Sequence, residues 1–274
     1  MSPSDYLAVD QGSYIQVNGL CMYYEAHGAG LPVILLHGGL ETCQMWTPVT
    51  NAFSRYYQVF TPDSRAHGRT DNPSGLFNFS VMAEDTAKFI QALGLDKPLV
   101  VGYSNGGRVA LNMAMNYPGL ARGYMIGGIY ISMMDEWHQM MTGPLGFDGP
   151  GNVDFERIAR TNPELIRSLQ EKHGVHHGPD YWKTLLVQVS QCWWAMPTHR
   201  QADFTKVVEP CLFWCGDRDV LCPPEQSLEM YRMVKGAELA VVPQAEHFTM
   251  FTQQIDVAIL ILLNYMKRVI EESI

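Results

Sequence analysis

The stretch of sequence that decides the fold is PLVVGYSNGG, residues 98–107. An apolar run that predicts a buried strand leads into Gly-x-Ser-x-Gly, and a helix is predicted to start near Gly107. A sharp turn from strand to helix exposes a serine hydroxyl, and the flanking glycines allow the turn because a Cβ at either position would crowd it. The pattern indicates that Ser104 is a nucleophile; the alternative is an ordinary strand-to-helix turn.

Strands and helices alternate on both sides of this turn. Ser13 to Val17 and Leu20 to Ala26 flank Asn18-Gly19, which favours a hairpin turn. Further strands are predicted at 32–36, 58–61, 98–101, 122–127, 211–215 and 238–242, and helices at 48–55, 80–93 with Ser80 as N-cap, 107–117, 224–233 and 254–272. This alternation predicts the α/β class, with a mostly parallel, doubly wound central sheet of about eight strands.

The alternation breaks at about Ile131 and resumes after Asp203. Helices are predicted within the break near 153–160, 163–173 and 181–195. Because the sheet pattern continues afterwards, we expect one α/β core domain (residues 1–130 and 204–274) with a helical insertion (residues 131–203). The insertion is rich in Met and Trp: Met133, Met134, Trp137, Met140, Met141, Trp182, Trp193, Trp194 and Met196.

Charge, apolar runs and cysteine spacing exclude several classes of partner and location. The 274 residues carry a net charge of −9 with scattered Lys and Arg, which argues against nucleic acid or an anionic membrane surface as partner. The first residues show no signal peptide, and no apolar run reaches transmembrane length. The six cysteines include no Cys-x-x-Cys pair, and we expect reduced thiols in a cytoplasmic protein.

No metal and no cofactor are expected. Three histidines, His173, His176 and His177, cluster in a glycine-containing stretch without a neighbouring thiol or carboxylate ligand. They predict a surface loop, in preference to a metal site.

A serine nucleophile needs a general base and an acid that orients it. Reactive groups in open α/β sheets gather at the carboxyl ends of the strands. His247 follows the last predicted strand, and Asp217 and Asp219 follow the strand before it. The order Ser, Asp, His is the one expected for this kind of site. Either aspartate fits, and we expect one to be buried against His247 and the other exposed.

An oxyanion hole needs two N–H groups aimed at one point. Asn105, directly after the serine, is expected to supply one. The other is expected from His37-Gly38-Gly39, after the strand at 32–36, with Gly39 as the donor. We expect His37 to be a structural, hydrogen-bonded side chain.

Several pieces together resemble the α/β-hydrolase fold enzymes, with similarity to small esterases and valacyclovir-hydrolase-like members. They are His37-Gly38-Gly39, the loop DSRAHGRT at 63–70, Gly102 to Gly106, Gly216-Asp217-Arg218-Asp219 with Pro223, and His247. The family pattern Gly-x-x-Asp-x-x-x-Pro implies Asp219 as the catalytic acid. One departure is Ala66, where the family commonly has Gly.

The resemblance implies that the insertion caps the serine and that the protein is a serine hydrolase of small carboxylic esters or lactones. A carbon–carbon bond hydrolase of dienones is the alternative, and a ligand receptor that retains the triad is a further one. Epoxide hydrolases and dehalogenases of this fold use Asp where this chain has Ser104. The expected pocket residues are Gly38, Leu40, Tyr103, Trp137, Met141, Trp193, Trp194 and Phe248. No cationic residue is obviously placed to hold a substrate carboxylate, although Arg157, Arg160 or Arg167 could do so.

Overall fold

The central feature of the computed structural model is an eight-stranded sheet, built within the described residues 12–131, 135–143 and 145–272. Its strand order is β1-β2-β4-β3-β5-β6-β9-β10, and all pairs from β4 to β10 are parallel. The hairpin β1–β2 adds antiparallel strands at one edge. The strands are β1 (Ser13–Val17), β2 (Leu20–His27), β3 (Pro32–Leu36), β4 (Gln58–Pro62), β5 (Leu99–Tyr103), β6 (Gly123–Gly127), β9 (Cys211–Gly216) and β10 (Glu238–Val242). The predicted fold class is confirmed.

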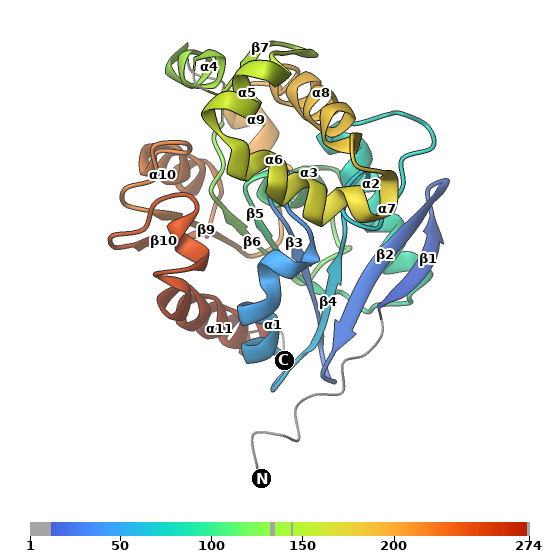
Figure 1. Ribbon diagram of the computed structural model, residues 1–274. Helices are drawn as coiled ribbons and strands as arrows, with labels where there is room; N and C mark the ends of the chain where they lie inside the picture. The colour runs from blue at the N-terminus through green and yellow to red at the C-terminus, as the bar shows by residue number, and fades with distance from the viewer. Residues whose placement is uncertain (1–11, 132–134, 144, 273–274) are drawn as a thin grey trace.

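Helices cover both faces of this sheet (Figure 1). Successive strand side chains point to opposite faces, so each strand feeds two separate cores. Val33 and Val101 pack with α1 and α11 on one face, whereas Ile34 and Val100 pack with α2, α3 and α10 on the other. The helices are α1 (Thr47–Phe53), α2 (Phe79–Ala92), α3 (Asn105–Asn116), α10 (Pro224–Met233) and α11 (Ile255–Glu271).

The segment between β6 and β9 lies over the carboxyl ends of the strands, at the top of Figure 1. It contains α4 (Asp135–Thr142), a small hairpin of β7 (Phe147–Gly149) and β8 (Asn152–Val153), α5 (Phe155–Thr161), α6 (Pro163–Leu169), η3 (Gln170–Gly174), α7 (Val175–His177), α8 (Tyr181–Trp194) and α9 (Gln201–Phe204). Its own apolar cluster includes Trp137, Phe147 and Trp182. We call residues 131–203 the insertion; Met133 and Met134 lie outside the described residues.

The structure differs from the expected elements in several places. Asn78, not Ser80, caps α2, because the Asn78 side chain accepts the Val81 N–H at 2.9 Å. The stretch with three histidines is not a surface loop: η3 is a π-helical turn, and His173 within it is 0% exposed. Helix α9 crosses the boundary expected at residue 203, and Phe204 packs in the core below. Within the part of the chain described, no helix is both long and apolar enough to cross a bilayer.

Candidate active site

Ser104 stands at the turn between β5 and α3 in a strained backbone conformation. Its φ of 56° and ψ of −122° lie where side chains are rarely found. The neighbouring glycines explain how the turn closes. A Cβ on Gly102 would stand 2.1 Å from the Gly106 oxygen, and a Cβ on Gly106 would stand 2.0 Å from the Leu36 oxygen. The local backbone contacts therefore hold the residue between them above the edge of the sheet.

His247 and Asp219 lie on the loops after β10 and β9 and touch each other. The Nδ1 of His247 is 2.8 Å from Oδ2 of Asp219. Asp219 is 2% exposed, and its other oxygen accepts the Cys222 N–H at 2.8 Å. Asp217 is exposed. The structure thus brings Asp219, and not Asp217, to the histidine, and it leaves Nε2 of the ring for another partner.

Tyr103 lies beneath this pair. Its hydroxyl donates to the His247 carbonyl at 3.1 Å and lies 3.4 Å from Oδ2 of Asp219. Its ring packs 5.0 Å from the His247 ring, centroid to centroid. As the last residue of β5, Tyr103 points to the same face as Leu99 and Val101, away from α3. It supports the histidine from below.

Gly39 and Asn105 lie against each other beside Ser104. A Cβ on Gly39 would come within 2.5 Å of Nδ2 of Asn105, so a side chain at position 39 would force the Asn105 amide to move. Within the described residues, the backbone N–H groups of Gly39 and Asn105 have no hydrogen-bond partner. Two unpaired donors beside a serine hydroxyl are the arrangement that stabilises an oxyanion.

Two buried histidines hold the loop that carries Gly39. His37 donates from Nδ1 to the Gly38 oxygen at 2.7 Å and accepts the Ser64 N–H at Nε2 at 2.8 Å. His67 accepts the Leu40 N–H at Nε2 at 3.2 Å, and its Nδ1 donates to the Arg65 carbonyl. Each ring donates once and accepts once, so both are neutral. Burial lowers the pKa of His37 to about 4 and that of His67 to about 3.

His173 extends this arrangement into the insertion. Its Nδ1 accepts the Gly68 N–H at 2.8 Å, and its Nε2 donates to the Leu40 oxygen at 3.2 Å. Burial lowers the pKa of His173 to about 3. His173 therefore joins the insertion to both loops beside the serine.

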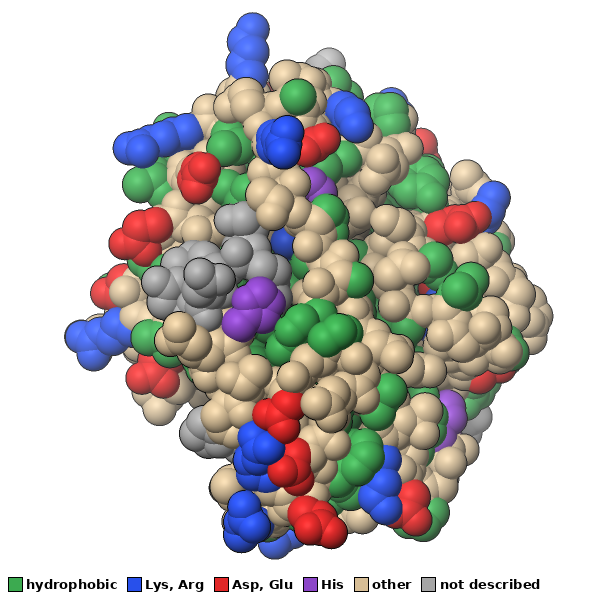
Figure 2. Space-filling view, turned by 90° about the horizontal axis from the view of Figure 1, so that it is seen from above, with side chains coloured by type: hydrophobic (Ala, Val, Ile, Leu, Met, Phe, Trp, Pro, Cys, Tyr) green, Lys and Arg blue, Asp and Glu red, His purple; other side chains and the backbone are tan. Residues whose placement is uncertain are grey.

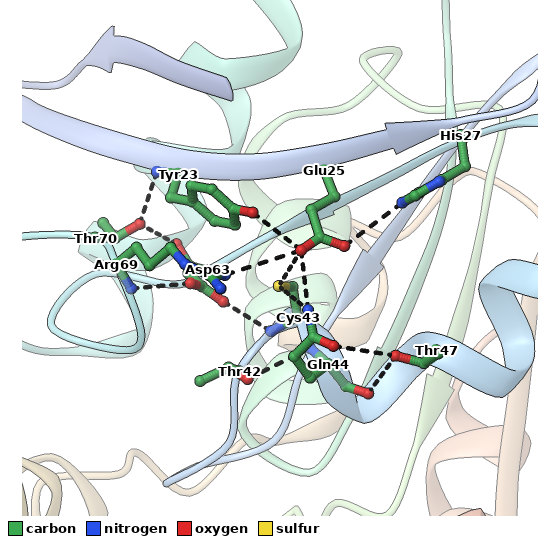
Figure 3. A network of polar contacts seen from close by, with 10 residues as sticks. All are labelled: Tyr23, Glu25, His27, Thr42, Cys43, Gln44, Thr47, Asp63, Arg69 and Thr70. Carbon is green, nitrogen blue, oxygen red and sulfur yellow. Dashed lines mark hydrogen bonds and ion pairs between the residues drawn. The ribbon is translucent and has the colours of Figure 1, made fainter. Parts of the chain in front are cut away.

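A polar network around Asp63 fixes the other side of the same loop (Figure 3). The Asp63 carboxylate accepts the Cys43 N–H at 2.7 Å and the Arg69 N–H at 2.9 Å. The Thr70 hydroxyl donates to the Asp63 carbonyl at 2.7 Å and accepts the Tyr23 N–H at 2.9 Å. The loop at 63–70 is thereby tied to β2 and to the turn that follows Gly39.

A cavity of about 410 Å³ opens above Ser104, between the core and the insertion. Seen from the side of the insertion, hydrophobic side chains gather near the middle of the face, and charged side chains lie mostly around them (Figure 2). The cavity is lined by residues of both parts of the chain. The core contributes Gly39, Leu40, Glu41, Ser104, Asn105, Arg108, Gly128, Ile129, Tyr130, Val220, Leu221, Cys222, Glu246, His247 and Phe248. The insertion contributes Trp137, Met141, Leu145, Phe147, Asn162, Leu165, Ser168, Lys172, Trp193 and Met196.

Five of the eight expected pocket residues line this cavity: Leu40, Trp137, Met141, Trp193 and Phe248. Gly38, Tyr103 and Trp194 do not. The Gly38 N–H faces the Met45 sulfur, and Tyr103 lies on the other face of the sheet. Trp194 is one residue further around α8 than Trp193 and packs on Trp137 and His138.

The sequence analysis missed Arg108, which lines the cavity from α3. Helical spacing was the available signal, because Arg108 follows Ser104 by one turn and so shares its face. The three arginines considered instead lie elsewhere. Arg157 pairs with Asp148 and Asp154, Arg167 pairs with Glu164, and Arg160 is exposed.

The described part of the chain holds no group of three or more His, Cys, Asp or Glu side chains arranged to bind a metal ion. Its six cysteines are free thiols.

Known proteins match part of this chain in sequence. Over 108 residues the chain is 40% identical to a protein of Caulobacter segnis named carbamate hydrolase RutD, and over 98 residues it is 36% identical to the soluble epoxide hydrolase of a Corynebacterium. These matches cover 37% and 36% of this chain. They span 40% and 34% of those relatives, which is less than half of either protein.

Solved structures match over nearly the whole chain. An esterase from Thermogutta terrifontis is similar with a TM-score of 0.72 and 23% identity, over 94% of this chain and 99% of that chain. A meta-cleavage product hydrolase from Pseudomonas fluorescens is similar with a TM-score of 0.75 and 21% identity, over 94% and 98%. At these identities the likeness shows a shared fold. The family model described as the alpha/beta hydrolase fold matches residues 32–180, more than half of the chain. The chain therefore belongs to the α/β hydrolase fold family.

Proposed function

We propose that this protein is a serine hydrolase of small carboxylic esters or lactones, with Ser104, His247 and Asp219 as its catalytic residues. The observation that carries the proposal is the buried 2.8 Å contact between Nδ1 of His247 and Asp219, with Ser104 and His247 lining one cavity. An imidazole held at Nδ1 by a carboxylate keeps Nε2 as the base for a serine hydroxyl.

In the acylation step, Nε2 of His247 takes the Ser104 proton while Oγ bonds to the ester carbonyl carbon. Asp219 orients the ring and stabilises the imidazolium. The N–H groups of Gly39 and Asn105 hold the negative oxygen of the tetrahedral intermediate. When that intermediate collapses, the bond to the leaving alcohol breaks and His247 donates its proton to the alcohol.

Deacylation repeats these steps with water. His247 takes a proton from the water as it attacks the acyl-enzyme, and it returns that proton to Ser104 as the acid leaves. No cofactor or metal takes part in this scheme.

The same proposal gives the insertion the role of a cap that selects the substrate. Met and Trp side chains provide an apolar surface of adaptable shape, and four of them line the cavity: Trp137, Met141, Trp193 and Met196. A cavity of about 410 Å³ suits a small molecule. Because a serine stands at the turn, the scheme has no place for the alkyl-enzyme chemistry of an epoxide hydrolase.

Labelling with a fluorophosphonate probe tests the nucleophile. We expect the wild-type protein to be labelled and the Ser104→Ala variant not to be; equal labelling of both would refute the assignment. A panel of p-nitrophenyl esters of increasing chain length, a lactone, a carbamate and a dienone then tests the substrate class. We expect the short esters or the lactone to be turned over fastest. Turnover of the dienone alone would favour a carbon–carbon bond hydrolase.

A further inference from the structure

Arg108 is a buried cation beside the proposed nucleophile. It is 3% exposed and lies on α3, one helical turn after Ser104. It lines the same cavity as Ser104 and His247. Four residues of α-helix rise by about 6 Å, so the backbone positions of Ser104 and Arg108 are one turn apart and both residues line the cavity.

Among the residues that the structure describes, the guanidinium group of Arg108 has no hydrogen-bond partner. All three of its nitrogens are buried and unpaired. Its clearest contact is with the ring of Tyr130, whose centroid lies 5.6 Å from the guanidinium carbon. Tyr130, Cys192, Cys222 and His199 interact electrostatically with Arg108, and none of them carries a negative charge at neutral pH. Burial lowers the pKa of Arg108.

A second buried arginine in the same chain shows what a paired one looks like. Arg65 is 2% exposed, and its Nε and Nη2 each donate to Asp85 at 2.7 Å. Nη1 of Arg65 donates to Asn72 and Ser74, both at 3.0 Å. The chain therefore provides a carboxylate for one buried guanidinium and none, among the described residues, for the other.

The carboxylates of the cavity wall are not directed at Arg108. Glu41 accepts two hydrogen bonds from Lys172, at 2.7 and 2.8 Å, and Glu246 is exposed at the surface. A buried charge is costly unless it is paired, and a guanidinium stays protonated in proteins. Arg108 therefore offers an unpaired cation to a ligand in this cavity.

Resting on the proposed function, we propose that the substrate carries a carboxylate in addition to its scissile ester carbonyl, and that Arg108 binds this carboxylate while Ser104 attacks the carbonyl. A planar carboxylate fits the fork of a guanidinium. The short spacing between the two residues and the small cavity point to a monoester of a short dicarboxylic acid, with four to six carbons in the acid.

A matched pair of substrates tests this inference. Monomethyl glutarate carries the carboxylate, and dimethyl glutarate differs from it only in a second methyl ester. We expect Arg108→Met to lower kcat/KM for the monoester about 100-fold, mostly through KM, and to leave the diester within about threefold. Arg108→Lys keeps the charge and loses the fork, so we expect about a tenfold loss on the monoester. Arg167→Met, which removes an arginine that is exposed on α6, is the control and should change neither substrate.

The outcomes separate the two proposals. If Ser104 is labelled and Arg108→Met keeps the wild-type ratio between monoester and diester, the carboxylate inference is wrong and the proposed function stands. If neither ester is cleaved and Ser104 is not labelled, the proposed function fails. Binding of glutarate, measured without turnover, then tests whether Arg108 holds a carboxylate. Glutarate should then raise the Tm of the wild-type protein and of Arg108→Lys more than glutaramide does. Equal Tm shifts with glutarate and glutaramide would refute carboxylate binding. Because this test uses the wild-type protein and Arg108→Lys, it does not depend on whether Arg108→Met folds.

Discussion

The two walls of the cavity are built in different ways. The floor, which the core provides, places Ser104, His247 and Gly39 through backbone turns and short hydrogen bonds. The roof, which the insertion provides, presents mainly Trp, Met, Leu and Phe side chains, which meet the floor through apolar contacts and a few polar ones. One of these polar contacts is the hydrogen bond from Nε1 of Trp193 to Oδ1 of Asn105, at 2.9 Å. Chemistry that depends on fractions of an ångström belongs on the rigid wall, and selection by shape belongs on the adaptable one.

The largest effect is expected where the floor loses its orienting acid. Asp219→Asn should lower kcat about 10³- to 10⁴-fold, because an amide in its place favours the wrong tautomer of His247. Asp217→Asn, two residues away and exposed, is the matched control and should stay within about twofold. Steady-state kinetics on one p-nitrophenyl ester measures both variants. A larger loss for Asp217→Asn would move the acid to that position.

Low pH should reduce the folding stability of the protein through the buried histidines that connect the insertion to the loops of the core. Burial lowers the pKa of His37 to about 4 and that of both His67 and His173 to about 3. Below about pH 6.5 the unfolded chain binds protons at these three histidines, whereas the native chain does not. Their contribution to the free energy of unfolding is therefore complete above that pH and decreases as the pH falls. At pH 6.5 about half of the unfolded chains already carry a proton at each of these histidines, so each histidine contributes about 1 kcal/mol between pH 6.5 and 5.5, or about 3 kcal/mol for the three. Burial raises the pKa of Asp63, which acts in the opposite sense.

Denaturant unfolding at pH 6.5 and at pH 5.5 measures that loss. His173→Gln keeps a donor and an acceptor and cannot be protonated, so it should reduce the difference by about 1 kcal/mol. The surface residue His176, changed to Gln, should reduce it little. An unchanged difference in His173→Gln would mean that His173 is not neutral in the folded protein.

The hydrogen bond between the two walls should have a smaller effect. Trp193→Phe keeps the aromatic surface and removes the donor to Asn105, which leaves a buried amide oxygen unpaired. We expect a loss of about 1–2 kcal/mol in stability and of about three- to tenfold in kcat, because the backbone N–H of Asn105 is one of the two proposed oxyanion donors. Trp194→Phe, which changes the neighbouring tryptophan outside the cavity lining, is the control. Equal losses in both variants would assign the effect to packing alone.

The roof itself should be the most tolerant part. Met141→Ala removes a flexible side chain from the cavity lining and leaves the floor intact. We expect kcat/KM for a butyrate ester to fall no more than about threefold and that for an octanoate ester to rise about threefold, since one pocket methylene is worth about 1–3 kcal/mol at most. A parallel fall on all chain lengths would show that the roof also orders the floor.

The sequence predicted the floor far better than the roof, for a physical reason. Strands buried on both faces and glycine turns leave strong local patterns, and β10 and α10 begin and end as expected. In the insertion, α4 and the β7–β8 hairpin carry no such pattern, and the contacts that stabilise them come from residues distant in the chain.

Single side chains show the same limit. The choice between Asp217 and Asp219 came from a family pattern, because both follow the same strand. His173 was expected at the surface, since its partners Leu40 and Gly68 lie more than a hundred residues away. Arg108 was overlooked because an arginine on a helix is usually solvated, and only the tertiary structure shows that this one is buried and unpaired.

The turn at residue 104 has a consequence for redesign. The close approaches of backbone atoms at Gly102 and Gly106 hold its direction. A cysteine or an aspartate at position 104 would place its thiol or carboxylate at the same point above the sheet. That point lines the same cavity as His247, Gly39 and Asn105. The turn therefore fixes the place of the reactive group by its backbone, and the residue at position 104 decides which group stands there.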